Sequence, residues 1–199
     1  MSSARQLAPL AALTAAFCAH LGFFNPYLPL WLKDQGLGLA AISLMVSLQA
    51  VTRLVAPYGW GWLSDHTGRR VLLLRYAASA ALVASLGLWV PGGQGWLFAV
   101  LLLLYAHMSA IMPLGEAALA DRVSREGGFD ARRYGRVRVF GSAGFLLSVL
   151  AAGWWFERRG LHEFPAWSQV TLGLMLLAAF WLPTSASRCR QWPVATCAT

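Results

Sequence analysis

The sequence predicts an all-α integral membrane protein, a bundle of six transmembrane helices. Only 12% of the 199 residues are charged and 58% are hydrophobic, whereas about a quarter of the residues in a soluble domain are charged. Six apolar runs are long enough to cross a bilayer, which takes about 20 residues in a helix. The runs are continuous rather than alternating, which disfavours a β-barrel.

The six predicted helices together form one transmembrane domain over residues 1–183, with gaps too short for a second domain. They occupy approximately residues 8–32, 39–62, 71–91, 96–118, 138–156 and 166–183. The first run could also be a signal peptide, because a single arginine precedes an apolar core. We expect a retained helix, since the apolar stretch continues and five further runs follow.

Residues 184–199 contain no apolar run. Their composition predicts a disordered tail, or an out-of-frame end to a shortened gene.

The charges of the connections predict the orientation of the helices. Arginines precede the first run, follow the second and the sixth, and gather in the connection 121–136, whereas the connections at 33–38, 91–95 and 157–165 are nearly neutral. Basic connections stay inside, so we expect both termini to be cytoplasmic in the inner (plasma) membrane. Most tryptophans fall at the predicted helix ends, where their amphipathic rings favour the membrane interface.

Several other classes of function are disfavoured. The net charge of +8 comes from bases in short gaps between apolar runs, so membrane orientation explains it better than nucleic-acid binding. Cys18, Cys189 and Cys197 have no metal-site or disulfide spacing, and we expect neither metal nor cofactor. No GxxxxGK[ST] motif indicates use of ATP. The four histidines are scattered, which does not favour a membrane enzyme.

A charged motif, GWGWLSDHTGRR at 59–70, lies between the second and third runs. Its order of Gly61, Asp65, Gly68, Arg69 and Arg70 resembles the loop signature of the major facilitator superfamily. Three stretches resemble the branch of phenylpropionate permeases and oligosaccharide:proton symporters: FFNPYLPLWLKDQGLG at 23–38, PLGEAALADR at 113–122 and YGRVRVFGSAGF at 134–145. The resemblance covers about residues 8–183.

The resemblance implies the N-terminal half of a twelve-helix fold, in which two six-helix halves hold the solute near the middle of the membrane. It implies proton-coupled transport of a small organic solute, an aromatic acid or a sugar. The chain would then be a truncated or split transporter that lacks its C-terminal half and could be inactive alone. A homodimer of two halves, or a membrane protein that does not transport, are the alternatives.

The five residues of the motif named above each have an expected role. Gly61 and Gly68 allow close approach and a tight turn, and Arg69 and Arg70 keep the turn in the cytoplasm. Asp65 can accept hydrogen bonds from an arginine or a helix N-terminus. The resemblance implies that Asp65 engages the opposite half and latches the outward-open state. The alternative is a motif that sets orientation only.

Three charged residues in or beside the predicted spans are candidates for a substrate site, because such charges are costly unless paired or facing water. Arg53 is either a cation in a cavity for an anionic substrate or a member of a structural ion pair. Glu116 and Arg138 are expected to form the polar floor of the cavity and to couple the proton. The alternative is a pair that only holds helices four and five together.

Other polar residues of the spans have two interpretations each. His20 and His107 could relay protons, since imidazole titrates near neutral pH, or form hydrogen bonds between helices. Asn25 and Gln49 could line the cavity or serve helix packing. The small residues at 141–144 are expected to let helix five pack closely against a neighbour.

Overall fold

The computed structural model describes residues 3–123 and 130–183. These form six long α-helices: α1 (Ser3–Asp34), α2 (Leu39–Thr67), α3 (Arg70–Ser85), α4 (Gln94–Val123), α5 (Ala131–Arg159) and α6 (Phe164–Trp181). Two short 3₁₀ segments, η1 (Leu86–Trp89) and η2 (Leu161–Glu163), follow α3 and precede α6. Six spans are long and apolar enough to cross a membrane. The predicted all-α membrane bundle is therefore confirmed.

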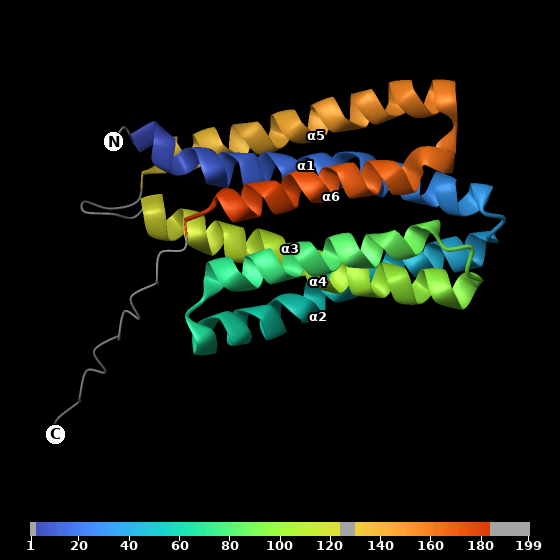
Figure 1. Ribbon diagram of the computed structural model, residues 1–199, viewed down its shortest axis with the longest axis horizontal. Helices are drawn as coiled ribbons and strands as arrows, with labels where there is room; N and C mark the ends of the chain where they lie inside the picture. Colours follow the sequence, from blue (N-terminus) through green and yellow to red (C-terminus); the bar gives the residue numbers. More distant parts are fainter. Residues whose placement is uncertain (1–2, 124–129, 184–199) are drawn as a thin grey trace.

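The helices form two groups that lie side by side (Figure 1). In one group α1 packs against α5 and α6, and in the other α4 packs against α2 and α3, while α3 and α6 join the groups. Exchanging α1–α3 with α4–α6 maps this set of contacts onto itself. A set of helix contacts that stays the same after this exchange is expected of two inverted three-helix repeats.

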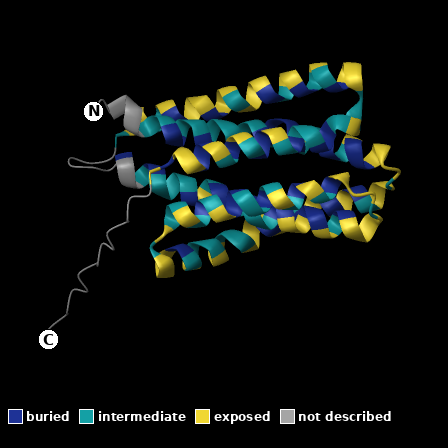
Figure 2. Cartoon of the chain, in the orientation of Figure 1, coloured by how far each residue is buried: buried dark blue, intermediate teal, exposed yellow. Residues whose placement is uncertain are grey.

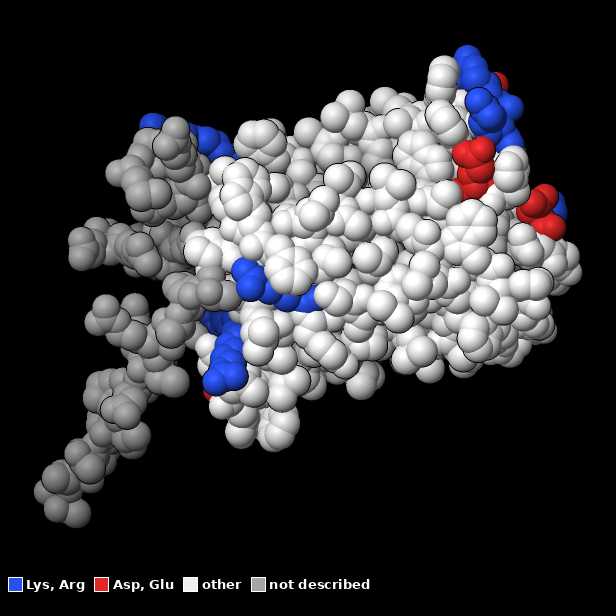
Figure 3. Space-filling model, in the orientation of Figure 1, with Lys and Arg blue, Asp and Glu red and all other residues white. Residues whose placement is uncertain are grey.

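Both groups run along the long axis of the bundle. The start of α1 and the end of α6 lie at the same end of it (Figure 1), as an even number of spans requires. In the view of Figure 3, a broad band without charged side chains separates charged groups that lie toward the two ends. This band is the surface that matches the apolar interior of a bilayer.

Close backbone packing holds α1 against α5. A Cβ atom added to Gly144 would lie 2.5 Å from the carbonyl oxygen of Ala15, and one added to Gly22 would lie 2.6 Å from that of Phe145. Any side chain larger than hydrogen would push the helices apart. The packing expected of the small residues at 141–144 is thus confirmed at Gly144.

Burial is uneven among the spans (Figure 2). Within the most apolar windows, 50% of the residues of α1 and 56% of those of α4 are buried, against only 17% for α2 and 22% for α5. The central helices α1 and α4 therefore form the core of the bundle. The faces of α2 and α5 are left open for lipid or for another protein.

The start of α5 differs from the expectation. It begins at Ala131 rather than near residue 138, because Asp130 caps it: Oδ1 of Asp130 accepts hydrogen bonds from the backbone N–H groups of Arg132 (3.1 Å) and Arg133 (3.2 Å). The expected connection 121–136 was therefore too long, since α4 reaches Val123. The predicted tail, 184–199, lies outside the described residues.

Pro26 and Pro29 lie inside α1, and the helix continues past them to Asp34.

Candidate functional site

A cavity of about 470 Å³ lies between α1, α2 and α4. This volume falls within the range of about 300–1,000 Å³ that is typical of small-molecule sites. Most of its walls are apolar, with aromatic and methionine side chains among them. The residues that can interact with a polar ligand are His20, Gln49, Thr52, Arg53, Tyr105, Ser109 and Glu116.

Helix α4 contributes one continuous wall. Tyr105, Ser109, Met112 and Glu116 are four, three and four residues apart, which is the spacing of one helix face. Of these four residues, only Glu116 was a candidate from the sequence. The recurrence of polar side chains at helical spacing in an otherwise apolar run was the signal that could have found Tyr105 and Ser109.

Prolines weaken the helix backbone beside the cavity. Pro57 in α2 and Pro113 in α4 both line it. A proline has no N–H group, so the carbonyls of Arg53 and Ser109, four residues earlier, lack their usual helical donors. Both carbonyls belong to residues that line the cavity.

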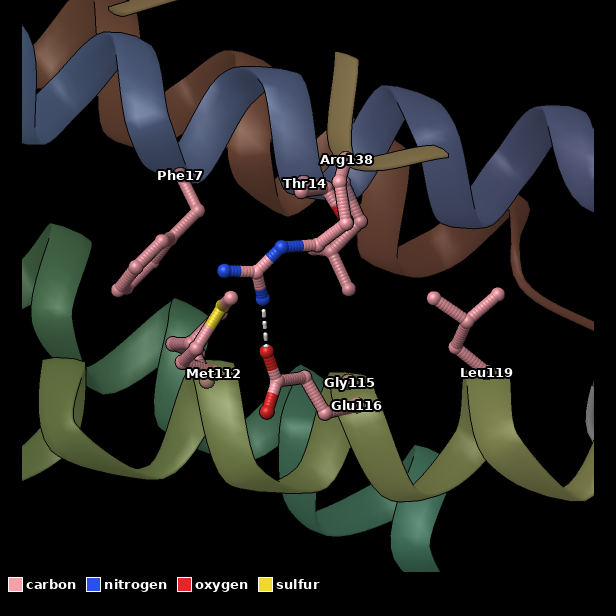
Figure 4. A pocket seen from close by; sticks show the side chains of 9 residues that line it. Thr14, Phe17, Met112, Gly115, Glu116, Leu119 and Arg138 are labelled. Atoms are coloured by element: carbon pink, nitrogen blue, oxygen red, sulfur yellow. Dashed lines mark hydrogen bonds and ion pairs between the residues drawn. The ribbon is translucent and has the colours of Figure 1, made fainter. Parts of the chain in front are cut away.

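The structure brings Glu116 and Arg138 together. Nη1 of Arg138 in α5 donates a hydrogen bond to Oε1 of Glu116 in α4. In Figure 4 the two side chains point toward each other between the helices, next to Thr14, Phe17 and Met112. The side chain of Arg138 is 49% exposed and that of Glu116 is 41% exposed. Because Glu116 also lines the cavity between α1, α2 and α4, the pair stands at its edge.

Arg53 lies on the wall that α2 contributes. The structural ion pair considered from the sequence is not found: no carboxylate within the described part of the chain lies within ion-pair distance of this guanidinium. Arg53 is exposed rather than packed.

His20 is buried and connects α1 to α6. Its Nδ1 lies 2.9 Å from Oγ1 of Thr171, and its ring stacks on Phe24 with centroids 4.8 Å apart. The Thr171 hydroxyl has one proton and lies 2.9 Å from the Trp167 carbonyl, to which it donates. When the threonine proton is donated to this carbonyl, the threonine oxygen accepts from Nδ1–H; the roles in the contact depend on the tautomer of His20. A hydrogen bond between helices, one of the two expected roles, is thus present.

His107 is not part of the cavity lining. Its Nδ1 lies 2.7 Å from the Leu103 carbonyl of its own helix, and its ring lies near Trp60 and Tyr76 on α2 and α3. The structure therefore separates His107 from the other candidate residues.

Asn25 and Gln49 form a contact between α1 and α2. Nε2 of Gln49 donates to Oδ1 of Asn25 over 2.8 Å. Gln49 lines the cavity, whereas Asn25 is not part of its lining and orients the Gln49 amide through this hydrogen bond.

The charged motif spans the end of α2, the turn at Gly68 and Arg69, and the first residue of α3. Gly68 ends α2 with φ of 62°, a left-handed conformation that favours glycine, and its N–H donates to the Ser64 carbonyl over 2.9 Å. Arg70 lies 4.0 Å from Asp65, whose side chain is 75% exposed. Arg69 is exposed, and nothing lies within 4 Å of a Cβ atom added to Gly61, so no close approach is made there in this half. The carboxylate of Asp65 is therefore accessible to a partner.

Arg75 was missed in the sequence, although it is a charge within an apolar run. It reaches from α3 to the C-terminal end of α6 and donates to the carbonyls of Ala179 (3.2 Å), Phe180 (3.0 Å) and Leu182 (2.7 Å). Carbonyls at a helix end have no helical donors, and a cation there also opposes the helix dipole. Arg75 is therefore a structural residue and not part of the cavity.

Comparison with known proteins identifies the family. The model of the MFS_1 like family matches residues 10–193, which is more than half of the chain. The chain belongs to this family. Its members are membrane transporters and not enzymes, in agreement with the resemblance of the motif to the major facilitator superfamily.

Two relatives illustrate the similarity. The maltose permease of Geobacillus stearothermophilus is 37% identical over 136 residues, which cover 67% of this chain and 33% of the permease. The multidrug resistance protein MdtG of Citrobacter koseri is 31% identical over 169 residues, which cover 81% of this chain and 40% of MdtG. The chain thus spans only about a third to two fifths of the length of these relatives.

Proposed function

We propose that the chain is the N-terminal six-helix half of a proton-coupled transporter that moves a small organic solute by alternating access. The observation that carries this proposal is a cavity among the central helices with Arg53 on its wall and the Glu116–Arg138 pair at its edge. Charged groups in the middle of a membrane protein are costly, and they mark solute and ion pathways.

Family membership supports a small organic solute. The two relatives described above are named for maltose transport and for multidrug resistance, so the relatives differ in substrate. A small organic solute is the description common to them. The resemblance of the motifs to phenylpropionate permeases and oligosaccharide symporters favours an aromatic acid or a sugar.

A second six-helix unit would complete the solute path. Large apolar side chains are exposed on the two least buried helices, among them Leu54 and Tyr58 on α2, and Phe140 and Leu150 on α5. In a twelve-helix transporter the opposite half covers such faces and supplies the other wall of the site. We propose a C-terminal half as the partner, with a second copy of this chain as the alternative.

Asp65 and the basic residues complete the proposal. With the basic turn of Arg69 and Arg70 in the cytoplasm, both termini lie there as well, in the inner membrane. The exposed Asp65 carboxylate then faces the second unit and latches it in the outward-open state.

Glu116 is the proposed proton carrier. Its carboxylate can exchange Arg138 for a proton as the cavity opens and closes, so the pair breaks and re-forms in each cycle. In a complete transporter, Glu116→Gln should abolish the dependence of uptake on a proton gradient. Unchanged uptake and an unchanged pH profile would rule out this role.

Crosslinking in the native membrane tests the assembly. The substitutions Tyr58→Cys and Leu150→Cys place reactive groups on α2 and α5. We expect a crosslinked product with a six-helix C-terminal half, and uptake driven by a proton gradient when both are reconstituted together. A product between two copies favours the homodimer. Absence of any specific product together with absence of gradient-driven uptake contradicts the proposal.

A further inference from the structure

We infer that Arg53 binds the anionic group of the solute, so that the substrate is a small organic acid with an apolar body rather than a neutral sugar. This inference rests on the proposed transport function and specifies the substrate of the same cavity.

The charges around the cavity do not balance. Arg53 and Glu116 are the charged residues among its lining, and Glu116 is already paired with Arg138. The guanidinium of Arg53 has no ion-pair partner among the side chains that the structure describes. A cation in a membrane span costs several kcal/mol unless a counter-charge or water compensates it. An anionic solute brings that counter-charge with it.

The groups near Arg53 suit a carboxylate. A guanidinium presents donors in a planar fork that matches the two oxygens of a carboxylate. Tyr105 on α4 also lines the cavity, and the positive charge of Arg53 acts on its hydroxyl group. Its hydroxyl can donate a further hydrogen bond to the same anion. The donors for the anion therefore come from two helices, α2 and α4.

The remaining wall suits an apolar body. Phe17 and Phe24 of α1 face the cavity together with Met108 and Met112 of α4. Aromatic rings bind flat apolar groups, and the unbranched methionine side chains adapt to different shapes. A sugar needs a hydrogen bond for each of its buried hydroxyl groups, whereas more than half of the lining residues are apolar. Thr52 offers an acceptor only, since its proton is already donated to the Leu48 carbonyl over 2.9 Å.

Binding to the purified chain in lipid nanodiscs tests the inference. Tryptophan fluorescence can follow the titration of three probes: 3-phenylpropionate, its neutral isostere 3-phenylpropanamide, and maltose. A charge-assisted hydrogen bond is worth enough to give at least about tenfold tighter binding of the acid than of the amide. We expect this preference in the native chain, and little binding of maltose.

Substitutions at Arg53 provide the decisive comparison. Arg53→Gln should remove the preference for the acid, and Arg53→Lys, which keeps the charge but not the fork, should retain part of it. Arg132→Gln is the control, because it removes an exposed arginine at the start of α5, outside the cavity lining. Native-like unfolding temperatures of these variants show that the fold is intact.

Three results would overturn the inference. They are equal binding of acid and amide, tighter binding of maltose, and a preference for the acid that survives Arg53→Gln. Each of them leaves the proposed transport function standing, since gradient-driven uptake by the assembled halves is measured separately. If Arg53 instead pairs with a carboxylate of the second unit, Arg53→Gln weakens crosslinking between the units, which also overturns the inference.

Discussion

Arg138 of α5 donates a hydrogen bond to Glu116 of α4, and so connects the two helix groups of the bundle at the edge of the cavity (Figure 1). The carboxylate and the guanidinium compensate each other's charge in a pocket whose other lining residues are apolar except for Thr14.

The two side chains of this pair should be coupled energetically. Because the side chains of Glu116 and Arg138 are 41% and 49% exposed, we expect a coupling energy of about 0.5–1 kcal/mol rather than the larger values of fully buried pairs. A double-mutant cycle with Glu116→Gln, Arg138→Gln and the double variant, followed by unfolding in SDS, measures it. Strictly additive losses would show that the pair makes no energetic contribution.

Gly144 should not tolerate a larger residue. In Gly144→Ala the new Cβ would lie 2.5 Å from the Ala15 carbonyl oxygen, so α1 and α5 must separate, at a cost of about 1–3 kcal/mol. Gly135→Ala on the same helix is the matched control, because nothing lies within 4 Å of its added Cβ. Alanine there should be neutral or stabilising, since it favours the helix. Equal unfolding free energies for the two variants would refute close packing at Gly144.

Arg75 should stabilise the end of α6. Replacing it with methionine keeps much of the apolar stem but leaves the carbonyls of Ala179, Phe180 and Leu182 without this donor. We expect a loss of about 1.5–3 kcal/mol in the free energy of unfolding, and faster amide hydrogen exchange at the end of α6. Arg75→Lys should restore part of the loss. If Arg75→Met unfolds like the native chain, the arginine contributes nothing to the helix end.

Trp60 should matter more than its neighbour Trp62. Nε1 of Trp60 in α2 donates to the Ala106 carbonyl of α4 over 2.9 Å, whereas Trp62 is 63% exposed. Trp60→Phe should therefore cost about 0.6–1 kcal/mol, the value of one hydrogen bond between membrane helices. Trp62→Phe should be close to neutral. Thermal unfolding of both variants makes the comparison, and a larger loss for Trp62→Phe would contradict the assigned contact.

Much of the fold could be predicted because a membrane restricts the possibilities. A run of about 20 apolar residues leaves a helix as the structure that satisfies its own backbone. The boundaries were harder, as at α5, whose start depends on a local cap by Asp130. The polar composition of that segment predicted a connection, yet one carboxylate was enough to begin the helix seven residues earlier than expected.

The candidate site was predicted in part. Arg53, Glu116 and Arg138 stood out because charges in apolar runs are few, and the pairing of Glu116 with Arg138 followed from their expected positions. The methionines of α4 could not be distinguished from core residues, since which face of α4 meets the cavity depends on how α1 and α2 pack. His107 lies outside the cavity lining for the same reason, because its ring faces α2 and α3.

The central claim is that the cavity between α1, α2 and α4 is open to water within the membrane. Labelling with a membrane-impermeant maleimide tests it most directly, in vesicles that contain the chain with Cys18, Cys189 and Cys197 replaced by serine. Ser109→Cys, on the cavity wall of α4, should be labelled. Leu103→Cys, an exposed apolar position on the same helix but outside the cavity lining, should not. Equal labelling of the two positions, or no labelling of Ser109→Cys, would contradict an aqueous solute path through this half.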